Sequence, residues 1–193
     1  MPQQRMPRAE RRLQIIAAGA AAFLLAGFDG TSMDDVAKQA GVTRLIVYRI
    51  FESKEQLYRA VLDTMLDDLA GAFENRQPAL ALHGGASHLL IGVARRQPDA
   101  FRLIWRHAAN EPMFSEYASA FREGIEAYAD GLMRPPITDP TLRRWAVRTV
   151  TAYHYDGICA WLDCGGLSGN DESDAAFERL LSSGSRALVH AWQ

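Results

Sequence analysis

The chain has 193 residues, of which 48% are hydrophobic, so it can form one or two domains with a buried core. It has no run of about 18 uninterrupted apolar residues, which argues against a membrane span. The formal net charge of −2 gives no argument for a nucleic-acid partner, but the charge is unevenly distributed. Residues 1–62 hold nine Lys and Arg against six Asp and Glu, whereas the remainder is acidic.

Four helices are predicted for the first third of the chain, over residues 9–27, 31–40, 43–51 and 53–74. The second helix is capped by Thr31 or Ser32 and ends before Gly41, where a left-handed turn residue costs least. Thr43 and Ser53 are the predicted N-caps of the next two helices, and the Thr43 hydroxyl can accept a hydrogen bond from an unpaired backbone N–H group. A secretory signal is the alternative interpretation of the apolar start of the chain.

Prolines and glycines divide the rest of the chain into further helical segments. The predicted helices cover residues 78–96, a short segment that begins at Pro98, and residues 112–134, 141–163 and 171–191. No alternating strand pattern and no internal repeat occur. The sequence therefore predicts an all-α fold with about nine helices. The only cysteines, Cys159 and Cys164, lie on different faces of a predicted helix, so we expect no disulfide and a reducing, cytoplasmic location.

Residues 31–51 have the spacing of two short helices joined by a tight turn. Met33, Val36, Ala37 and Ala40 follow the i, i+3, i+4, i+7 pattern of a buried helical face. Gly41 then turns the chain into the next helix. This arrangement is a helix-turn-helix, whose second helix can lie in the major groove of DNA.

The same residues resemble the DNA-binding domain of the TetR (tetracycline-repressor-like) transcriptional regulators. The shared order is A-x-x-A-G-V-T, then Y-R-x-F-x-S-K-E-x-L, from Ala37 to Leu57. The resemblance covers about residues 8–62. It implies a helix-turn-helix domain over residues 1–55 and an effector-binding and dimerisation domain over residues 56–193. The implied function is that of a homodimeric repressor released from a palindromic operator by a small-molecule effector.

The residues predicted to contact DNA are Thr31, Thr43, Arg44, Leu45, Ile46, Tyr48, Arg49 and Lys54. Hydroxyl groups and a lysine ammonium at a helix N-terminus suit phosphates. Arg44 and Arg49 can each bind a guanine through two hydrogen bonds, and Arg44 is favoured because it lies near the start of the third helix. Leu45 and Ile46 can pack on thymine methyl groups, but a slightly rotated third helix that buries Ile46 and Ile50 is an equal alternative.

The last two long helices are predicted to form the dimer interface, because two helix-turn-helix units on a palindrome double the DNA contacts. The apolar residues assigned to this interface are Trp145, Val150, Ile158, Trp161, Phe177, Leu181 and Leu188. The alternative is that these side chains pack wholly within one subunit.

The middle helices are dense in aromatic residues, and apolar walls with a few polar groups are typical of small-molecule sites. The predicted effector contacts are Phe101, Trp105, Phe114, Tyr117, Phe121, Tyr153, His154 and Trp161. Core packing is the alternative for each aromatic residue, and an apolar or aromatic effector is implied mainly by the family resemblance. His154, Asp156 and Cys159 do not share one helical face, so we predict no metal site, and no cofactor either.

Two other functions remain open at this stage. One is an all-helical enzyme or ligand carrier on the same scaffold, which the apolar Leu45 and Ile46 in the third helix would suit. The other is a regulator controlled by a partner protein. No catalytic arrangement can be defended, so we do not expect an enzyme.

Overall fold

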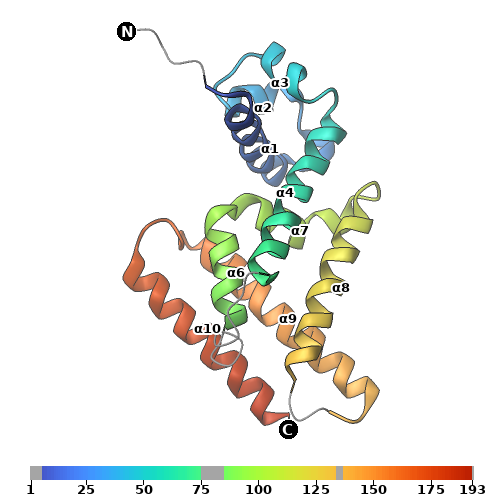
Figure 1. Ribbon diagram of the computed structural model, residues 1–193, viewed down its shortest axis with the longest axis vertical. Coiled ribbons are helices and arrows are strands. Elements are labelled where there is room, and N and C mark those ends of the chain that lie inside the picture. The colour runs from blue at the N-terminus through green and yellow to red at the C-terminus, as the bar shows by residue number, and fades with distance from the viewer. Residues whose placement is uncertain (1–5, 75–84, 134–136, 193) are drawn as a thin grey trace. The chain divides into compact units, whose positions relative to one another are not determined.

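The structure is a computed structural model, and it describes residues 6–74, 85–133 and 137–192. Over these ranges the fold is all-α, as predicted, with nine α-helices, one short 3-10 helix and no strand. The chain forms two compact units (Figure 1). The first contains residues 1–67 and 99–117, and the second contains residues 68–98 and 118–193. The predicted domain boundary after residue 55 thus falls inside the first unit.

The helices of the first unit are α1 (Arg8–Gly30), α2 (Met33–Gln39), α3 (Arg44–Ile50), the first part of α4 (Lys54–Glu74), α7 (Pro98–Arg106) and the 3-10 helix η1 (Ala108–Asn110). The core of this unit includes four aromatic rings, namely Tyr58 and three phenylalanine rings that contact it. The Tyr58 ring stacks on Phe114 at 4.2 Å and meets Phe23 and Phe28 edge-on at 4.8 and 5.4 Å. Aromatic pairs at such distances add to the stabilisation from apolar burial.

Helix α1 is long and apolar enough to pass for a membrane span by composition alone. Its apolar side chains Ile15, Ile16 and Phe23 are buried in the first unit. Gly19 lies directly against Leu57 of α4, where a Cβ atom would come within 3.2 Å of the leucine side chain. Core packing therefore accounts for this apolar run.

The turns around α2 depend on a few polar side chains. Ser32, not Thr31, caps α2, because the Asp35 amide donates to the Ser32 hydroxyl at 3.2 Å and the Ser32 amide donates to the Asp35 carboxylate at 2.9 Å. Gly41 adopts the predicted left-handed conformation with φ of 63°. Ser53 caps α4 by accepting from the Gln56 amide at 3.1 Å.

The second unit contains the end of α4, α6 (Gly85–Arg96), α8 (Ser115–Leu132) from residue 118, α9 (Pro140–Asp163) and α10 (Asp171–Ala191). Helix α10 packs along α9 and also contacts α6 (Figure 1). Helix α8 packs on α9 through Phe121 and Tyr155, whose rings lie 5.2 Å apart. The predicted start of α9 is confirmed, since Asp139 accepts from the Thr141 and Leu142 amides at 2.8 Å. The first part of the helix predicted over residues 78–96 lies outside the described residues.

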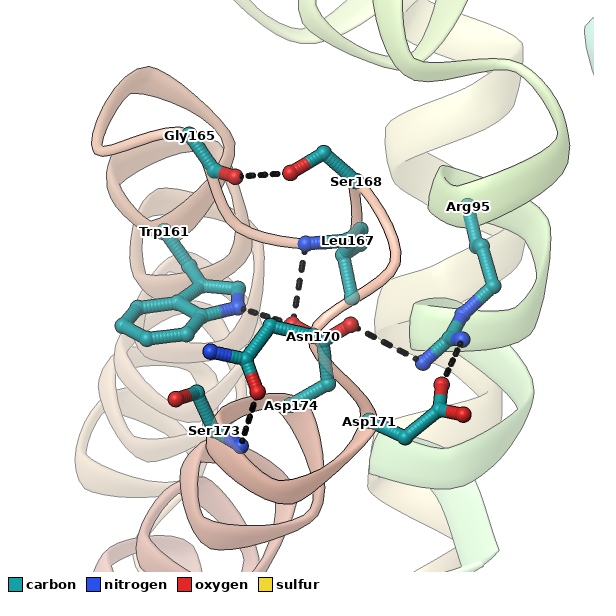
Figure 2. Close-up of polar contacts among 9 residues, drawn as sticks. All are labelled: Arg95, Trp161, Gly165, Leu167, Ser168, Asn170, Asp171, Ser173 and Asp174. Carbon is teal, nitrogen blue, oxygen red and sulfur yellow. Dashed lines mark hydrogen bonds and ion pairs between the residues drawn. The ribbon is translucent and has the colours of Figure 1, made fainter.

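The loop between α9 and α10 is fixed by a buried carboxylate, that of Asp174, which is 2% exposed (Figure 2). It accepts hydrogen bonds from the Trp161 indole at 2.8 Å, the Leu167 amide at 2.9 Å and the Arg95 guanidinium at 3.3 Å. Burial acts to raise the pKa of Asp174, but these bonds and the charge of Arg95 outweigh it and lower the pKa below its ordinary value. The contacts join α6, α9, α10 and the loop at one point.

We expect Asp174→Asn to lower the free energy of unfolding by about 1–3 kcal/mol at pH 7, because an amide cannot accept from all three buried or partly buried donors. The native carboxylate is stabilising above its unfolded pKa of about 4, and that contribution disappears as pH falls through the lower folded pKa. Urea denaturation at pH 7 and at lower pH measures both effects. Asp171→Asn is the matched control, since Asp171 contacts the same Arg95 at 3.4 Å but is 91% exposed. Equal losses in the two variants would contradict the assignment.

Candidate functional site

Helix α3 presents most of its surface to solvent. Of its seven residues only Val47 is buried, while the Leu45 and Tyr48 side chains are 68% and 39% exposed. Arg49 is exposed and has no ion-pair partner among the described residues. Thr43 occupies the N-cap position, but its hydroxyl makes no cap hydrogen bond, contrary to the sequence-based expectation. That hydroxyl is therefore available to an external acceptor or donor.

Arg44 is held on this surface by two neighbours. Its guanidinium lies 2.8 Å from the Asp34 carboxylate and 5.1 Å from the centre of the Tyr48 ring, with a further contact of 3.4 Å to the Tyr48 hydroxyl. The hydrogen bond to Tyr48 and the charge of Asp34 raise the pKa of Arg44. Exposed ion pairs of this kind contribute little to stability, so a competing anion or base edge can replace Asp34.

Two residues predicted to contact DNA also stabilise the end of α1. Thr31 is 3% exposed. Its hydroxyl lies 2.7 Å from the Gly27 carbonyl and 3.1 Å from the Ala22 carbonyl, and both carbonyls can accept its hydrogen bond. The Lys54 ammonium donates to the Phe28 carbonyl at 2.7 Å and lies 4.4 Å from the centre of the Phe28 ring. The other predicted contacts therefore lie on α3 and its N-cap, whereas Thr31 and Lys54 lie next to the end of α1.

Sequence reasoning missed a basic groove next to α3, which we call the N-terminal groove. It is lined by Met6, Arg8, Arg11, Ile46, Arg49 and Ile50. None of these side chains is acidic, and Ile46 and Ile50 are half-buried along it. The spacing of Arg8 and Arg11 on one face of α1 was the signal that could have revealed it. Phosphates are the natural ligands of such a surface.

The second unit contains a cavity of about 170 Å³ that is partly open to solvent. Four helices and the end of α4 supply its walls, with Phe73 from α4, Leu90 from α6, Ile125 from α8, Val150 from α9 and Val189 from α10 among the lining residues. An engineered apolar cavity of about 150 Å³ is large enough to hold benzene. The cavity thus suits a compact ligand of one ring or a short chain.

A serine–histidine pair lies in the cavity wall. The His154 Nδ1 atom lies 2.8 Å from the Val150 carbonyl, which can only accept, so Nδ1 carries the proton. The His154 Nε2 atom then accepts from the Ser87 hydroxyl at 3.0 Å. Burial lowers the pKa of His154, so the ring is neutral near pH 7. Thr151 also lines the cavity, and its buried hydroxyl has no hydrogen-bond partner among the described residues.

Of the predicted effector contacts, only His154 lines this cavity. Phe121 packs on Tyr155, and Trp161 stacks on Phe177 at 5.0 Å beside the Asp174 loop. Four others belong to the first unit, namely Phe101, Trp105, Phe114 and Tyr117. The cavity instead gathers small polar residues that carry no periodic signal in the sequence, namely Ser87, Thr151, Ser182, Ser185 and, as its one charged residue, Arg186.

The outer surface of α9 and α10 forms a shallow groove. Its lining residues are Thr141, Arg144, Trp145, Arg148, Thr149, Ala152, Tyr153 and Leu188. The Trp145 side chain is 51% exposed there. Gly184 lies so close to Tyr153 that a Cβ atom would meet its hydroxyl oxygen at 2.1 Å. Of the residues assigned to the dimer interface, Trp145 and Leu188 line this groove, whereas Val150, Ile158 and Leu181 are buried within the unit.

Comparison with known proteins extends these observations. The family model "Bacterial regulatory proteins, tetR family" matches residues 15–61. The HTH-type transcriptional activator FasR of Mycolicibacterium smegmatis is 42% identical over 172 residues, which cover 82% of this chain and 75% of FasR. The HTH-type transcriptional regulator TtgR of Pseudomonas putida is 42% identical over 69 residues, covering 34% of this chain and 33% of TtgR.

A solved structure agrees over nearly the whole chain. The TetR-like transcriptional regulator from Rhodococcus sp. RHA1 superposes with a TM-score of 0.69 at 19% identity, covering 94% of this chain and 96% of that one. At this identity the likeness concerns the fold alone. The fold and the helix-turn-helix are therefore shared by proteins that regulate transcription.

The neutral, buried His154 predicts a pH dependence of stability. Below the ordinary histidine pKa of about 6.5 the unfolded chain binds a proton that the folded chain does not, so the free energy of unfolding should fall as pH falls from about 6.5 to 5. One proton limits the slope to about 1.4 kcal/mol per pH unit. Chemical denaturation across this range should show a shallower slope for His154→Gln, whereas the exposed control His190→Gln should keep the wild-type slope. An unchanged slope in His154→Gln would contradict the neutral assignment.

Proposed function

The chain belongs to the TetR family of DNA-binding transcriptional regulators, and we propose that it acts as a ligand-responsive homodimer whose two α3 helices bind a palindromic operator. The observation that supports this most strongly is the exposure of α3, which buries only Val47 and carries two arginines, a tyrosine and a threonine on its outer face. Two such helices on a twofold axis suit successive major grooves of B-form DNA.

Within this interface we assign base contacts to Arg44 and Arg49 and phosphate contacts to Thr43 and Tyr48. Leu45, 68% exposed at the start of α3, suits a thymine methyl group. Lys54 keeps a phosphate role, because an ammonium has three donors and only two carbonyls, those of Phe28 and Asp29, accept from it. Thr31 supports the interface from behind by fixing the turn before α2.

The N-terminal groove extends the interface along the DNA backbone. Arg8 and Arg11 lie beside Arg49 with no acidic residue in the groove, so they add phosphate contacts next to the recognition helix. Such contacts strengthen binding without selecting a sequence, and they make it strongly salt-dependent.

The cavity of the second unit is the proposed effector site. It contacts α4 through Phe73 and α6 through Ser87 and Leu90. At the end of α6, the Arg96 side chain donates to the Asp68 carboxylate of α4 at 2.7 Å, and Gln97, which follows α6, donates to the same carboxylate at 3.0 Å. The chain passes between the two units three times, within α4 after residue 67, after residue 98 and within α8 after residue 117. A ligand that shifts α6 against α4 therefore acts directly where the first two of these connections leave the unit.

The direction of regulation is a separate matter. Repression relieved by the effector is our prediction from family resemblance, whereas FasR, the 42% identical relative, is described as an activator. Either outcome uses the same exposed α3 and the same cavity. We place the protein in the cytoplasm, where its operator DNA is, and assign it no enzymatic activity, in line with relatives that regulate transcription.

We expect Arg44→Ala to weaken operator binding by about 1–3 kcal/mol, the usual value of a bidentate arginine–guanine contact. Asp34→Asn should have the opposite effect, because it removes the carboxylate that competes for Arg44 at 2.8 Å. Fluorescence anisotropy with a fragment of the protein's own promoter at two salt concentrations measures both.

Arg179→Ala, at an exposed position on α10, is the matched control for that measurement. Wild-type protein that never prefers its promoter over random duplex, with no steep salt dependence, would end the proposal.

Trp145→Glu should produce a monomer and lower operator affinity roughly 100-fold or more, because the second DNA-binding unit is then no longer linked to the first. Light scattering after gel filtration gives the oligomeric state. The control is Leu25→Glu, which introduces the same charge in place of an apolar side chain that is 90% exposed on α1. A Trp145→Glu variant that stays dimeric would move the interface away from this groove.

A further inference from the structure

The chemistry of the cavity restricts the kind of molecule it can bind. We propose that its ligand is a small carboxylic acid with an apolar body and one uncharged hydrogen-bonding group, in which Arg186 binds the carboxylate and Thr151 the uncharged group. The inference rests on the proposed function only in treating this cavity as the effector site. Size, charge and unpaired polar groups each support it.

The size of the cavity suits a compact apolar body. The cavity measures about 170 Å³, and aliphatic and aromatic side chains such as Phe73, Leu90 and Val150 form most of its walls. A single ring or a chain of similar volume fills such a space.

Charge selects an anion over a cation. Among the described lining residues Arg186 alone carries a formal charge, and none is Asp or Glu. Its neighbours one turn away on α10 are Ser182, Ser183, Val189 and His190, so the helix supplies no carboxylate partner. No ion pair to Arg186 occurs in the described ranges. A planar guanidinium matches a carboxylate through two parallel hydrogen bonds.

The polar wall includes the buried hydroxyl of Thr151, which comes from α9. Thr151 is 3% exposed, and its Oγ1 atom has no partner within the described part of the chain. A buried polar group without a hydrogen bond is costly, so a ligand hydroxyl or carbonyl that reaches it gains affinity. This observation is independent of Arg186, which lies on a different helix.

The remaining polar pair does not compete for the ligand's charge. Ser87 already donates to His154, and both ring nitrogens of His154 are occupied by Ser87 and the Val150 carbonyl. The pair is therefore a closed, neutral part of the wall. The preference for a carboxylate then depends on Arg186, and the preference for a second polar group depends on Thr151.

A set of benzoate derivatives tests both assignments with the full-length protein free of DNA. Isothermal titration calorimetry at pH 7 compares 3- and 4-hydroxybenzoate, benzoate, the matching hydroxybenzamides and benzylamine. We expect the hydroxybenzoate that binds better to exceed its amide by about five- to tenfold, as a charge-assisted contact at an exposed arginine would give. Benzylamine should not bind.

Two variants separate the contributions. Arg186→Gln should abolish the preference for acid over amide, while Thr151→Val should keep that preference and abolish the preference for hydroxybenzoate over benzoate. Thr151→Val preserves side-chain volume and removes an unsatisfied hydroxyl, so it should fold at least as well as wild type. Arg179→Gln, outside the cavity on the same helix, is the matched control for loss of charge.

Several results would overturn the inference. Equal affinity for acid and amide in the wild type, or an acid preference that survives in Arg186→Gln, would remove the role of Arg186. A hydroxyl preference that survives in Thr151→Val would remove that of Thr151. Operator binding by the ligand-free protein is measured separately, so its failure would end the proposed function without touching these affinities.

Discussion

A helix of seven residues does not persist in water on its own, and this constraint shapes the whole first unit. Helix α3 leaves its outer face to solvent and is held by one buried face, with Val47 fully buried and Phe51 1% exposed at its C-cap. The stability it lacks comes from its surroundings. These are the capping box of α2, the left-handed Gly41 and the aromatic core around Tyr58. The polar residues of α3 therefore do not contribute to the core, and their side chains can bind an external partner.

Features that depend on neighbouring residues are the parts of this structure that the sequence predicts. Helix starts depend on local chemistry, so the caps at Ser32, Ser53 and Asp139 could be predicted from residue type and spacing alone. The core face of the helix-turn-helix follows from 3.6-residue periodicity. By contrast, Lys54 reaches back 26 positions to the Phe28 carbonyl, and no local pattern predicts such a contact. Its charge suggested a phosphate contact, whereas its position also gives it a structural task.

The residues that line the cavity were harder to predict from the sequence. Aromatic density pointed to Phe101, Phe114 and Trp161, yet large rings are the residues that fill space most efficiently, and these three are packed or stacked in the two cores. Space remains where side chains are small. Ser87 and Thr151 line the cavity, as do the aromatic residues Phe73, Tyr128 and Tyr155, but they come from separate helices, and no periodic pattern connects them.

Asp68 connects α4 to Arg96 at the end of α6 and to Gln97, the residue that follows it. Its carboxylate is 24% exposed and accepts from both Nε and Nη2 of Arg96, whose side chain is 54% exposed. Burial acts to raise the pKa of Asp68, but the bonds from Arg96 and Gln97 prevail and lower it, so the carboxylate stays charged near neutral pH. Coupling between a ligand and DNA is typically about 1–3 kcal/mol. A half-exposed ion pair is worth about 0–1 kcal/mol, so loss of the Asp68–Arg96 pair alone does not account for coupling of that size, and the proposed effector also has to change how the cavity-lining side chains of α4 and α6 pack.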